Sequence, residues 1–202
     1  MRIFLYLLFI FLPLQATAQT KLATAGISGE QDLLDLLDSY VDKRDAYSKQ
    51  KEKKIDQLKL KLRTAEDIPQ RLALLNSIYR EYHTYHYDSA MVYVNRGLAL
   101  SESENNAYYT TLNKINRAAV LSTGGFYSQS EELLEDIKKK GVPKQLKQYY
   151  YYTRTWLYNY WEAFSNKSEF MGYYHKKKFE NLKLTMEVTS SKDVALHAYL
   201  SG

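Results

Sequence analysis

Apolar residues recur at intervals of three and four along most of the chain, which is the period of a helix that packs on one side. The first stripe predicts a long amphipathic helix over residues 30–63, roughly 50 Å in length at 1.5 Å per residue. It comprises Leu33, Leu37, Tyr40, Tyr47, Ile55, Leu58 and Leu62. Lysines dominate the second half of this segment, and we interpret them as a solvated face rather than a membrane contact.

Residues 64–202 are predicted to form helix pairs separated by short turns. One pair turns at residues 83–86 and the next at Gly124–Gly125, before a stop at residues 141–143. A third pair is expected from Leu146 to Phe164 and from about Phe170 to Leu184. A fourth begins near Lys192 and is incomplete at residue 202. Only three prolines and eight glycines interrupt the chain, which favours helix over sheet.

Two of the expected second helices begin alike, at Tyr87 and at Tyr127. Each has an aromatic residue at the turn, a small residue three positions later, and apolar residues beyond it. This pattern resembles the tetratricopeptide repeat (TPR), in which small residues let the two helices of a pair approach closely. Ala118 and Pro143 also stand where that repeat has a small residue and a proline. The predicted fold is all-α: a TPR-like α-solenoid of antiparallel helix pairs, preceded by the long amphipathic helix.

The N-terminus has the pattern of a secretory signal. Arg2 precedes an apolar run over residues 3–12, Pro13 follows it, and Ala16 and Ala18 provide small residues before a cleavage point. We expect a signal peptide at residues 1–18, cleavage after Ala18, a linker at residues 19–29, and an exported, periplasmic protein. An uncleaved anchor is the alternative, but a bilayer of roughly 30 Å requires about 20 apolar residues. The chain has no cysteine, which excludes disulfides and a lipid-modified cysteine.

The chain contains twenty tyrosines, for which packing between helices is the simplest explanation. The segment from Leu146 to Phe164 carries aromatic residues on every side, so some of them are expected to face solvent or a ligand. Candidate partner-binding residues are Tyr149, Tyr152, Arg154, Trp156, Tyr160 and Trp161. The net charge of +5 is a mild excess, and an exported protein is not expected to bind nucleic acid.

The sequence offers little evidence for catalysis. His83 and His86 are three residues apart in a turn and lack the third strong ligand that a zinc site requires. The neighbouring carboxylates Glu131, Glu132 and Glu135 have the pattern of a solvated helix face. We find no nucleophile elbow and no phosphate loop. We therefore predict a non-enzymatic protein with no catalytic residues, no cofactor and no metal.

Two longer stretches, residues 34–59 and 78–93, resemble a known family. Lys43-Arg44-Asp45-Ala46-Tyr47 in the first and Tyr87-Asp88-Ser89-Ala90-Met91 in the second carry the likeness. They are similar to the exported tetratricopeptide regulators of Gram-negative bacteria grouped as domain of unknown function family 6377. The resemblance implies a periplasmic helical-repeat sensor, followed by a membrane-spanning helix and a cytoplasmic regulatory part. We expect this chain to be the N-terminal, sensory portion, with membrane association through a C-terminal part that it lacks.

The predicted function is an extracytoplasmic binding or sensory module that recognises a protein or peptide on a concave helical surface. The alternative is a glycan-binding surface protein that uses exposed tyrosine and tryptophan rings. Rings clustered in one shallow groove beside Asn or Asp would favour a glycan. Scattered rings among mixed charges would favour a peptide.

Overall fold

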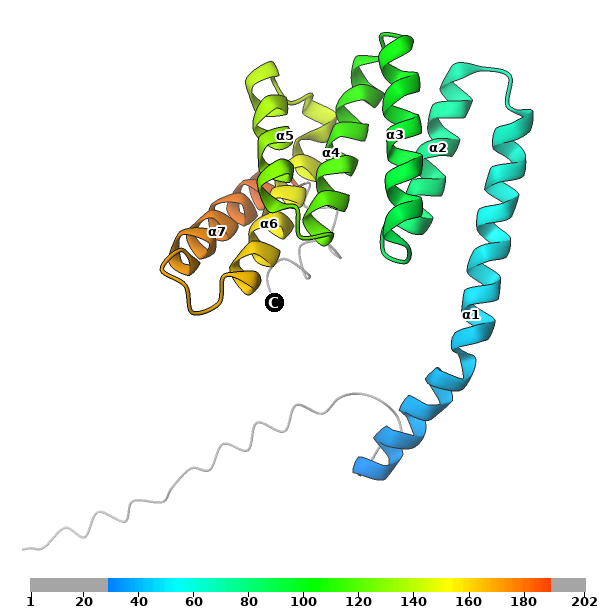
Figure 1. Cartoon of the computed structure of the whole chain (residues 1–202), viewed down its shortest axis with the longest axis vertical. Coiled ribbons are helices and arrows are strands. Elements are labelled where there is room, and N and C mark those ends of the chain that lie inside the picture. Colours follow the sequence, from blue (N-terminus) through cyan, green and yellow to red (C-terminus); the bar gives the residue numbers. More distant parts are fainter. Residues whose placement is uncertain (1–28, 190–202) are drawn as a thin grey trace, which may run out of the picture. The chain divides into compact units, whose positions relative to one another are not determined.

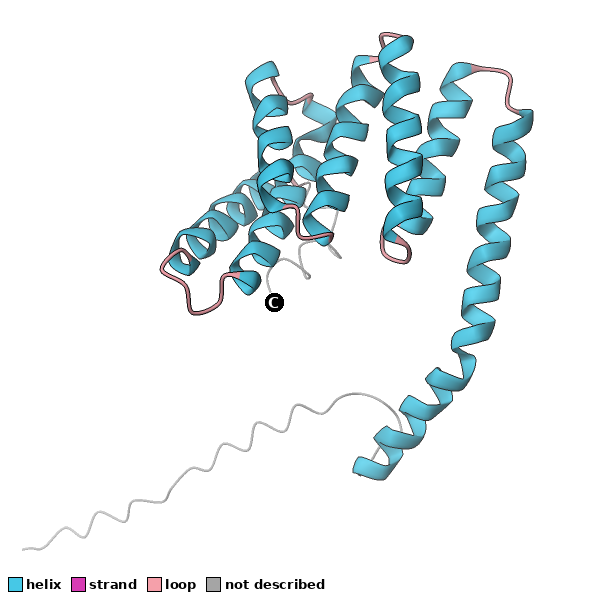
Figure 2. Ribbon diagram, viewed as in Figure 1, coloured by secondary structure: helices cyan, strands magenta, loops and turns pink. Residues whose placement is uncertain are grey.

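The computed structural model describes residues 29–189, which contain seven α-helices, one short 3-10 helix (η1) and no strand (Figure 1, Figure 2). The elements are α1 (Glu30–Thr64), α2 (Ile68–Tyr82), α3 (Tyr87–Ser103), α4 (Ala107–Thr123), α5 (Tyr127–Lys140), η1 (Lys144–Leu146), α6 (Lys147–Phe164) and α7 (Met171–Val188). The long helix predicted over residues 30–63 corresponds to α1. The predicted signal peptide, most of the predicted linker and the predicted fourth pair lie outside the described residues.

Contacts divide the chain into two units, residues 1–46 and 47–202, with the boundary inside α1. In the first unit the apolar stripe faces water, since Leu33, Leu37 and Tyr40 are each more than half exposed. In the second unit the stripe enters the core, where Ile55 is fully buried. The spacing of apolar residues thus predicts α1 and its apolar side. It does not predict which part of that side is buried.

Besides the second half of α1, the described part of the second unit contains three helix pairs, α2/α3, α4/α5 and α6/α7, with α3 packed on α4 and α4 packed on α6 (Figure 1). Helices α2, α3 and α4 each begin after a residue whose side chain caps them. Asp67 accepts a hydrogen bond from the Gln70 amide at 2.6 Å, and Asn106 accepts one from the Tyr109 amide at 3.0 Å. The openings that resemble each other in sequence, at Tyr87 and Tyr127, are the first residues of α3 and α5.

Small residues set the close approach of α4 and α5. Ser130 of α5 donates a hydrogen bond to the Ala118 carbonyl at 2.8 Å, and its hydroxyl lies 2.9 Å from that of Ser122. All three side chains are buried. The small residues predicted for the TPR pattern therefore occupy the helix crossing.

Glycine has a comparable role between pairs. A Cβ atom on Gly97 of α3 would lie 2.8 Å from the Asn113 side-chain oxygen of α4, which is too close for an ordinary contact. Asn113 is almost fully buried. The α3–α4 contact therefore depends on the absence of a side chain at position 97.

Two clusters of buried side chains form the core of this unit. One joins Ile55 of α1 to α2, α3 and α4 through Ile78, Tyr79, Val94 and Val120. The other joins α4, α5 and α6 through Ile115, Leu134, Tyr150 and Leu157. Helix α4 contributes to both clusters, so it links the successive pairs and positions the surface described next.

Candidate functional site

A pocket of about 270 Å³ opens on the surface formed by the first helices of the three pairs. The turn after α2, the C-terminal half of α4, and α6 all contribute to it. Its lining residues are His83, Thr84, Ala119, Ser122, Thr123, Tyr149, Tyr152, Thr153, Trp156 and Tyr160. Four of the six predicted partner-binding residues are among them, namely Tyr149, Tyr152, Trp156 and Tyr160. We call this set of lining residues the aromatic pocket.

Consecutive turns of α6 supply the rings of the aromatic pocket. Residues 152, 156 and 160 are four apart and therefore lie on one face of the helix. The Tyr152 and Trp156 rings are 6.3 Å apart and nearly perpendicular, and the Trp156 and Tyr160 rings are 5.5 Å apart. All three side chains are half-buried. Each therefore packs against its neighbours and still presents part of its ring to solvent.

A chain of hydrogen bonds behind the pocket ties the three first helices together. Tyr149 of α6 donates to the Asn116 side-chain oxygen of α4 at 2.9 Å, and the Asn116 amide donates to Asn76 of α2 at 3.1 Å. The Tyr149 hydroxyl also lies 3.4 Å from that of Tyr79 on α2. Burial raises the pKa of both tyrosines, so these hydroxyls stay protonated and the chain is neutral.

The electrostatic character of the aromatic pocket follows from its lining. None of its ten lining residues is a lysine, an arginine or a carboxylate, and four of them are serines or threonines. His83, at the rim, is exposed. The pocket thus offers ring faces, hydroxyl groups and an imidazole rather than charge.

Arg154 lies elsewhere, which corrects the expectation that it would be an exposed anchor. Its side chain is only 7% exposed and forms an ion pair with Glu135 of α5 at 2.5 Å. The guanidinium also donates to the Tyr150 and Tyr158 hydroxyls at 3.1 and 3.0 Å and to Asn181 of α7 at 3.1 Å. Arg154 therefore joins α5, α6 and α7 inside the protein and does not reach the pocket.

The acidic residues of α5 also differ from expectation. Glu135 pairs with Arg154, and Glu131 accepts a hydrogen bond from the Tyr158 hydroxyl at 2.6 Å. These two carboxylates face α6, whereas Glu132 is exposed as predicted for a solvated face. Sequence alone does not distinguish Glu131, Glu132 and Glu135, because their environments depend on where α6 packs.

Trp161 is the sixth predicted residue, and the structure places it outside the aromatic pocket. Its ring stacks on Tyr174 of α7 at 4.5 Å and on Tyr127 of α5 at 5.6 Å. It is half-buried between these helices. Its position is that of an inter-helix packing residue.

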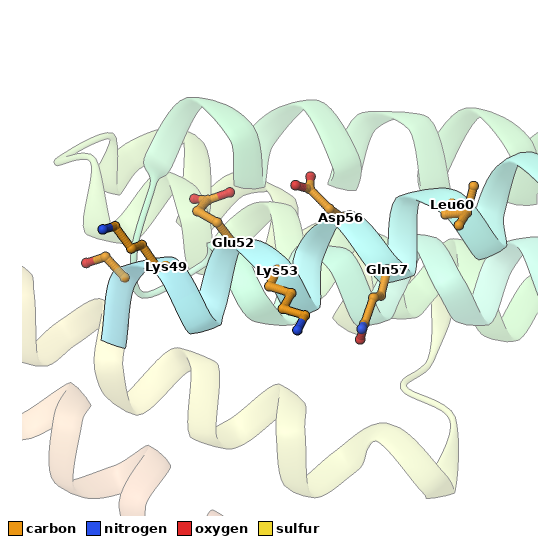
Figure 3. A pocket seen from close by; sticks show the side chains of 7 residues that line it. Lys49, Glu52, Lys53, Asp56, Gln57 and Leu60 are labelled. Carbon is orange, nitrogen blue, oxygen red and sulfur yellow. The ribbon is translucent and has the colours of Figure 1, made fainter. Parts of the chain in front are cut away.

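Another hollow, of about 620 Å³, lies along α1 and has a different construction. It is lined by Ser48, Lys49, Glu52, Lys53, Asp56, Gln57 and Leu60, all from that one helix. Figure 3 shows that Glu52 and Asp56 point away from Lys53 and Gln57, so the polar groups do not converge. This hollow is an open helix surface and offers no assembled site.

The described residues give no further support for metal chemistry. Within residues 29–189 no group of three or more His, Cys, Asp or Glu side chains could hold a metal ion. His86 instead caps α3, accepting a hydrogen bond from the Ser89 amide at 3.4 Å. In the same range, no helix is long and apolar enough to cross a membrane.

Comparison with known proteins identifies the family. The model of the SusR N-terminal TPR domain matches residues 41–201, which is well over half of the chain. The chain belongs to this family. Searches of curated proteins and of solved structures returned no match.

Membership in the SusR N-terminal TPR domain family confirms the all-α, TPR-like fold predicted from the repeat pattern. It also confirms the predicted relationship to the N-terminal portion of a TPR-containing sensor or regulator, here of the Bacteroidetes type. A TPR-type domain of this family is a protein-interaction or sensory module, and such helical scaffolds are typically non-catalytic.

Sequence reasoning missed the part of the aromatic pocket that lies outside α6. The sequence places His83 and Thr84 in the turn at residues 83–86 and assigns no role to Thr123. The repeat pattern could have indicated these three residues. In a TPR-like array, the ends of the first helices and the turns that follow them lie at one edge. These residues are about thirty to seventy positions from α6 in sequence, so local patterns do not show that they lie beside its rings.

Proposed function

We propose that this chain is the extracytoplasmic binding module of a sensor, and that it recognises a segment of a protein or peptide at the aromatic pocket. The observation that carries the proposal is that four predicted binding residues of α6 line one pocket together with residues of α4 and of the turn after α2. Half-buried Tyr and Trp rings are the side chains that most often dominate the energy of a protein interface. A pocket of this volume accommodates one or two side chains of a partner.

The hydrogen-bonded chain behind the pocket supports this proposal because it makes the surface rigid. Asn116 and Tyr149 connect three helices that come from three different pairs. Binding a ligand therefore requires little further ordering of the side chains that line the pocket, and this small entropic cost favours affinity.

Site-specific photo-crosslinking tests the proposal in cells. We would replace Tyr152 with the photoreactive residue p-benzoylphenylalanine, irradiate, and identify the adducts by mass spectrometry. A discrete polypeptide adduct is expected from position 152 and not from position 173, an exposed tyrosine of α7 that serves as the matched control. Identical adducts from both positions, or none from position 152, would reject the proposal.

A glycan is the second candidate ligand, and the neutral lining of the pocket favours it. Clustered rings beside hydroxyl groups and His83 suit a sugar, which stacks its apolar face on aromatic rings and needs hydrogen bonds rather than charge. Replacing Trp161 with Phe leaves Trp156 as the single tryptophan, so its fluorescence reports on the pocket alone. Saturable quenching by a glycan, together with no polypeptide adduct, would favour this candidate.

The proposed location follows from the N-terminal pattern, with cleavage after Ala18. Removing residues 1–18 should leave the product in the cytoplasm in a cell-fractionation experiment. Continued export of the shortened chain would contradict the signal-peptide assignment.

A further inference from the structure

A second hollow, of about 490 Å³, lies where the end of α1, the following loop and the first turns of α2 meet α3. Its lining residues are Lys59, Leu62, Arg63, Ala65, Arg71, Tyr93 and Arg96. Four of the seven are cations, they come from three different helices, and none of the seven is acidic. We call this set the basic hollow. It shares no residue with the aromatic pocket.

The arginines of the basic hollow are not neutralised by the protein. Arg63, Arg71 and Arg96 are exposed, and none of them forms an ion pair with a carboxylate of residues 29–189. Lys59 is the exception, since its ammonium lies 3.3 Å from Asp56. Like charges that converge on one hollow repel each other, so an anion placed between them is stabilised by all of them.

Aromatic rings hold two of these cations in place. The Arg96 guanidinium lies 5.2 Å from the centre of the Tyr93 ring, and Lys59 lies 5.6 Å from that of Tyr82. The two rings stack on each other at 5.8 Å. A hydrogen bond with Tyr82 and the neighbouring Asp56 raise the pKa of Lys59 despite its partial burial, so this ammonium stays charged. The positive groups are thus partly fixed in position before any ligand arrives.

We propose that the basic hollow binds a small, multiply charged oxyanion, of which a phosphate group is the simplest example. Arginine suits this role because its planar guanidinium donates paired N–H groups to two oxygens of one phosphate. Arg63, Arg71 and Arg96 supply three such groups around one volume, and Lys59 adds a point charge at its wall. An apolar ligand would leave these charges without compensation.

The binding of inorganic phosphate, measured by isothermal titration calorimetry at constant ionic strength, tests the proposal. We expect saturable binding that weakens about tenfold or more in each of the variants Arg71→Gln and Arg96→Gln, because each loses a charge-assisted hydrogen-bond pair. Arg117→Gln is the matched control, since it removes the same charge from an exposed arginine of α4 outside the hollow. Circular dichroism would verify that all three variants fold.

Two results would overturn the proposal: no saturable phosphate binding, or equal weakening in Arg71→Gln, Arg96→Gln and Arg117→Gln. A second arm distinguishes the source of the phosphate group. Vesicles of phosphatidylglycerol that bind the protein and release it on addition of phosphate would identify a lipid headgroup. Phosphate binding without vesicle binding would identify a free phosphorylated compound.

Discussion

Helix α6 carries aromatic side chains on two faces whose surroundings differ. On one face, Tyr150 and Tyr158 are almost fully buried, and Arg154 between them binds Glu135 and Asn181. On the other face, Tyr152, Trp156 and Tyr160 are half-buried and line the aromatic pocket. Both faces repeat every four residues. The residue types on the two faces of α6 therefore do not show which face has a structural role and which could bind a ligand.

The difference lies in what stands opposite each face. Helices α5 and α7 pack on the side of Arg154 and supply acceptors for Arg154 and for the Tyr158 hydroxyl. On the side of Trp156, α6 borders the ends of α4 and α2, and a volume remains open. A comparison of substitutions on the two faces should therefore separate effects on stability from effects on binding.

The largest effect is expected from Arg154→Met on the buried face. Removing Arg154 leaves Glu135 and two tyrosine hydroxyls without their donor. Because Glu135 is 37% exposed and water replaces part of this contact, the free energy of unfolding should fall by about 2.5 kcal/mol, less than for a fully buried pair. Urea denaturation monitored by circular dichroism measures this. The matched control Arg117→Met should change stability by less than about 0.5 kcal/mol, as exposed substitutions usually do. A loss no larger than that of the control would show that the buried network contributes little.

On the pocket face, Trp156→Ala should act mainly on binding. Loss of the central ring is expected to lower the yield of the photo-crosslinked adduct at position 152 about tenfold, as truncation of an interface anchor commonly does. The free energy of unfolding should fall by no more than about 2 kcal/mol, because the side chain is only half-buried. An unchanged yield would move the binding surface away from this pocket.

A smaller and more selective comparison uses two tyrosines of α6. Tyr158→Phe removes a hydroxyl that donates to Glu131 and accepts from Arg154, which should cost about 2 kcal/mol of stability. Tyr151→Phe removes a hydroxyl for which no hydrogen bond is found within residues 29–189, and should cost less than about 0.5 kcal/mol. Equal losses in thermal denaturation would contradict the assigned hydrogen bonds.

The smallest expected effect is a dependence of stability on pH. Burial alone would raise the pKa of Glu135, but the hydrogen bond and charge of Arg154 outweigh it and hold this pKa below its ordinary value of 4.5. A carboxylate whose pKa is lower in the folded state stabilises the fold above pH 4.5 and loses that contribution as the pH falls through the folded pKa. Denaturation between pH 6 and pH 3 should show this loss. The loss of stability should be smaller in the Arg154→Met variant than in the unmodified protein. Identical pH profiles for the two proteins would rule out Glu135 as the source of the loss.

Much of the fold was predictable because it depends on local patterns. Breaks between apolar stripes located the turns, and Tyr87 and Tyr127 marked the starts of two second helices. The contribution of α6 to the aromatic pocket was predictable for the same reason. What could not be predicted was which side of an all-aromatic helix is covered, because that depends on helices distant in sequence.

One signal for Arg154 was present and could have been used. Arg154 is four residues from both Tyr150 and Tyr158, so the three share a helix face. Glu131 and Glu135 show the same spacing on the preceding helix. Complementary donors and acceptors at equal intervals on consecutive helices indicate two faces that pack against each other. No matching pattern of this kind in the sequence indicates what covers the apolar stripe from Leu33 to Tyr47.

The contact between Gly97 and Asn113 has a consequence for how such a chain evolves. Repeat proteins are often treated as interchangeable modules, whose stability is a sum of repeat and nearest-neighbour contributions. Here the junction between the first and second pairs depends on one residue without a side chain that faces one buried amide. A pair that is duplicated or moved to another position would meet a different neighbour and lose that match. The order of the pairs is thus constrained at their junctions as well as within each pair.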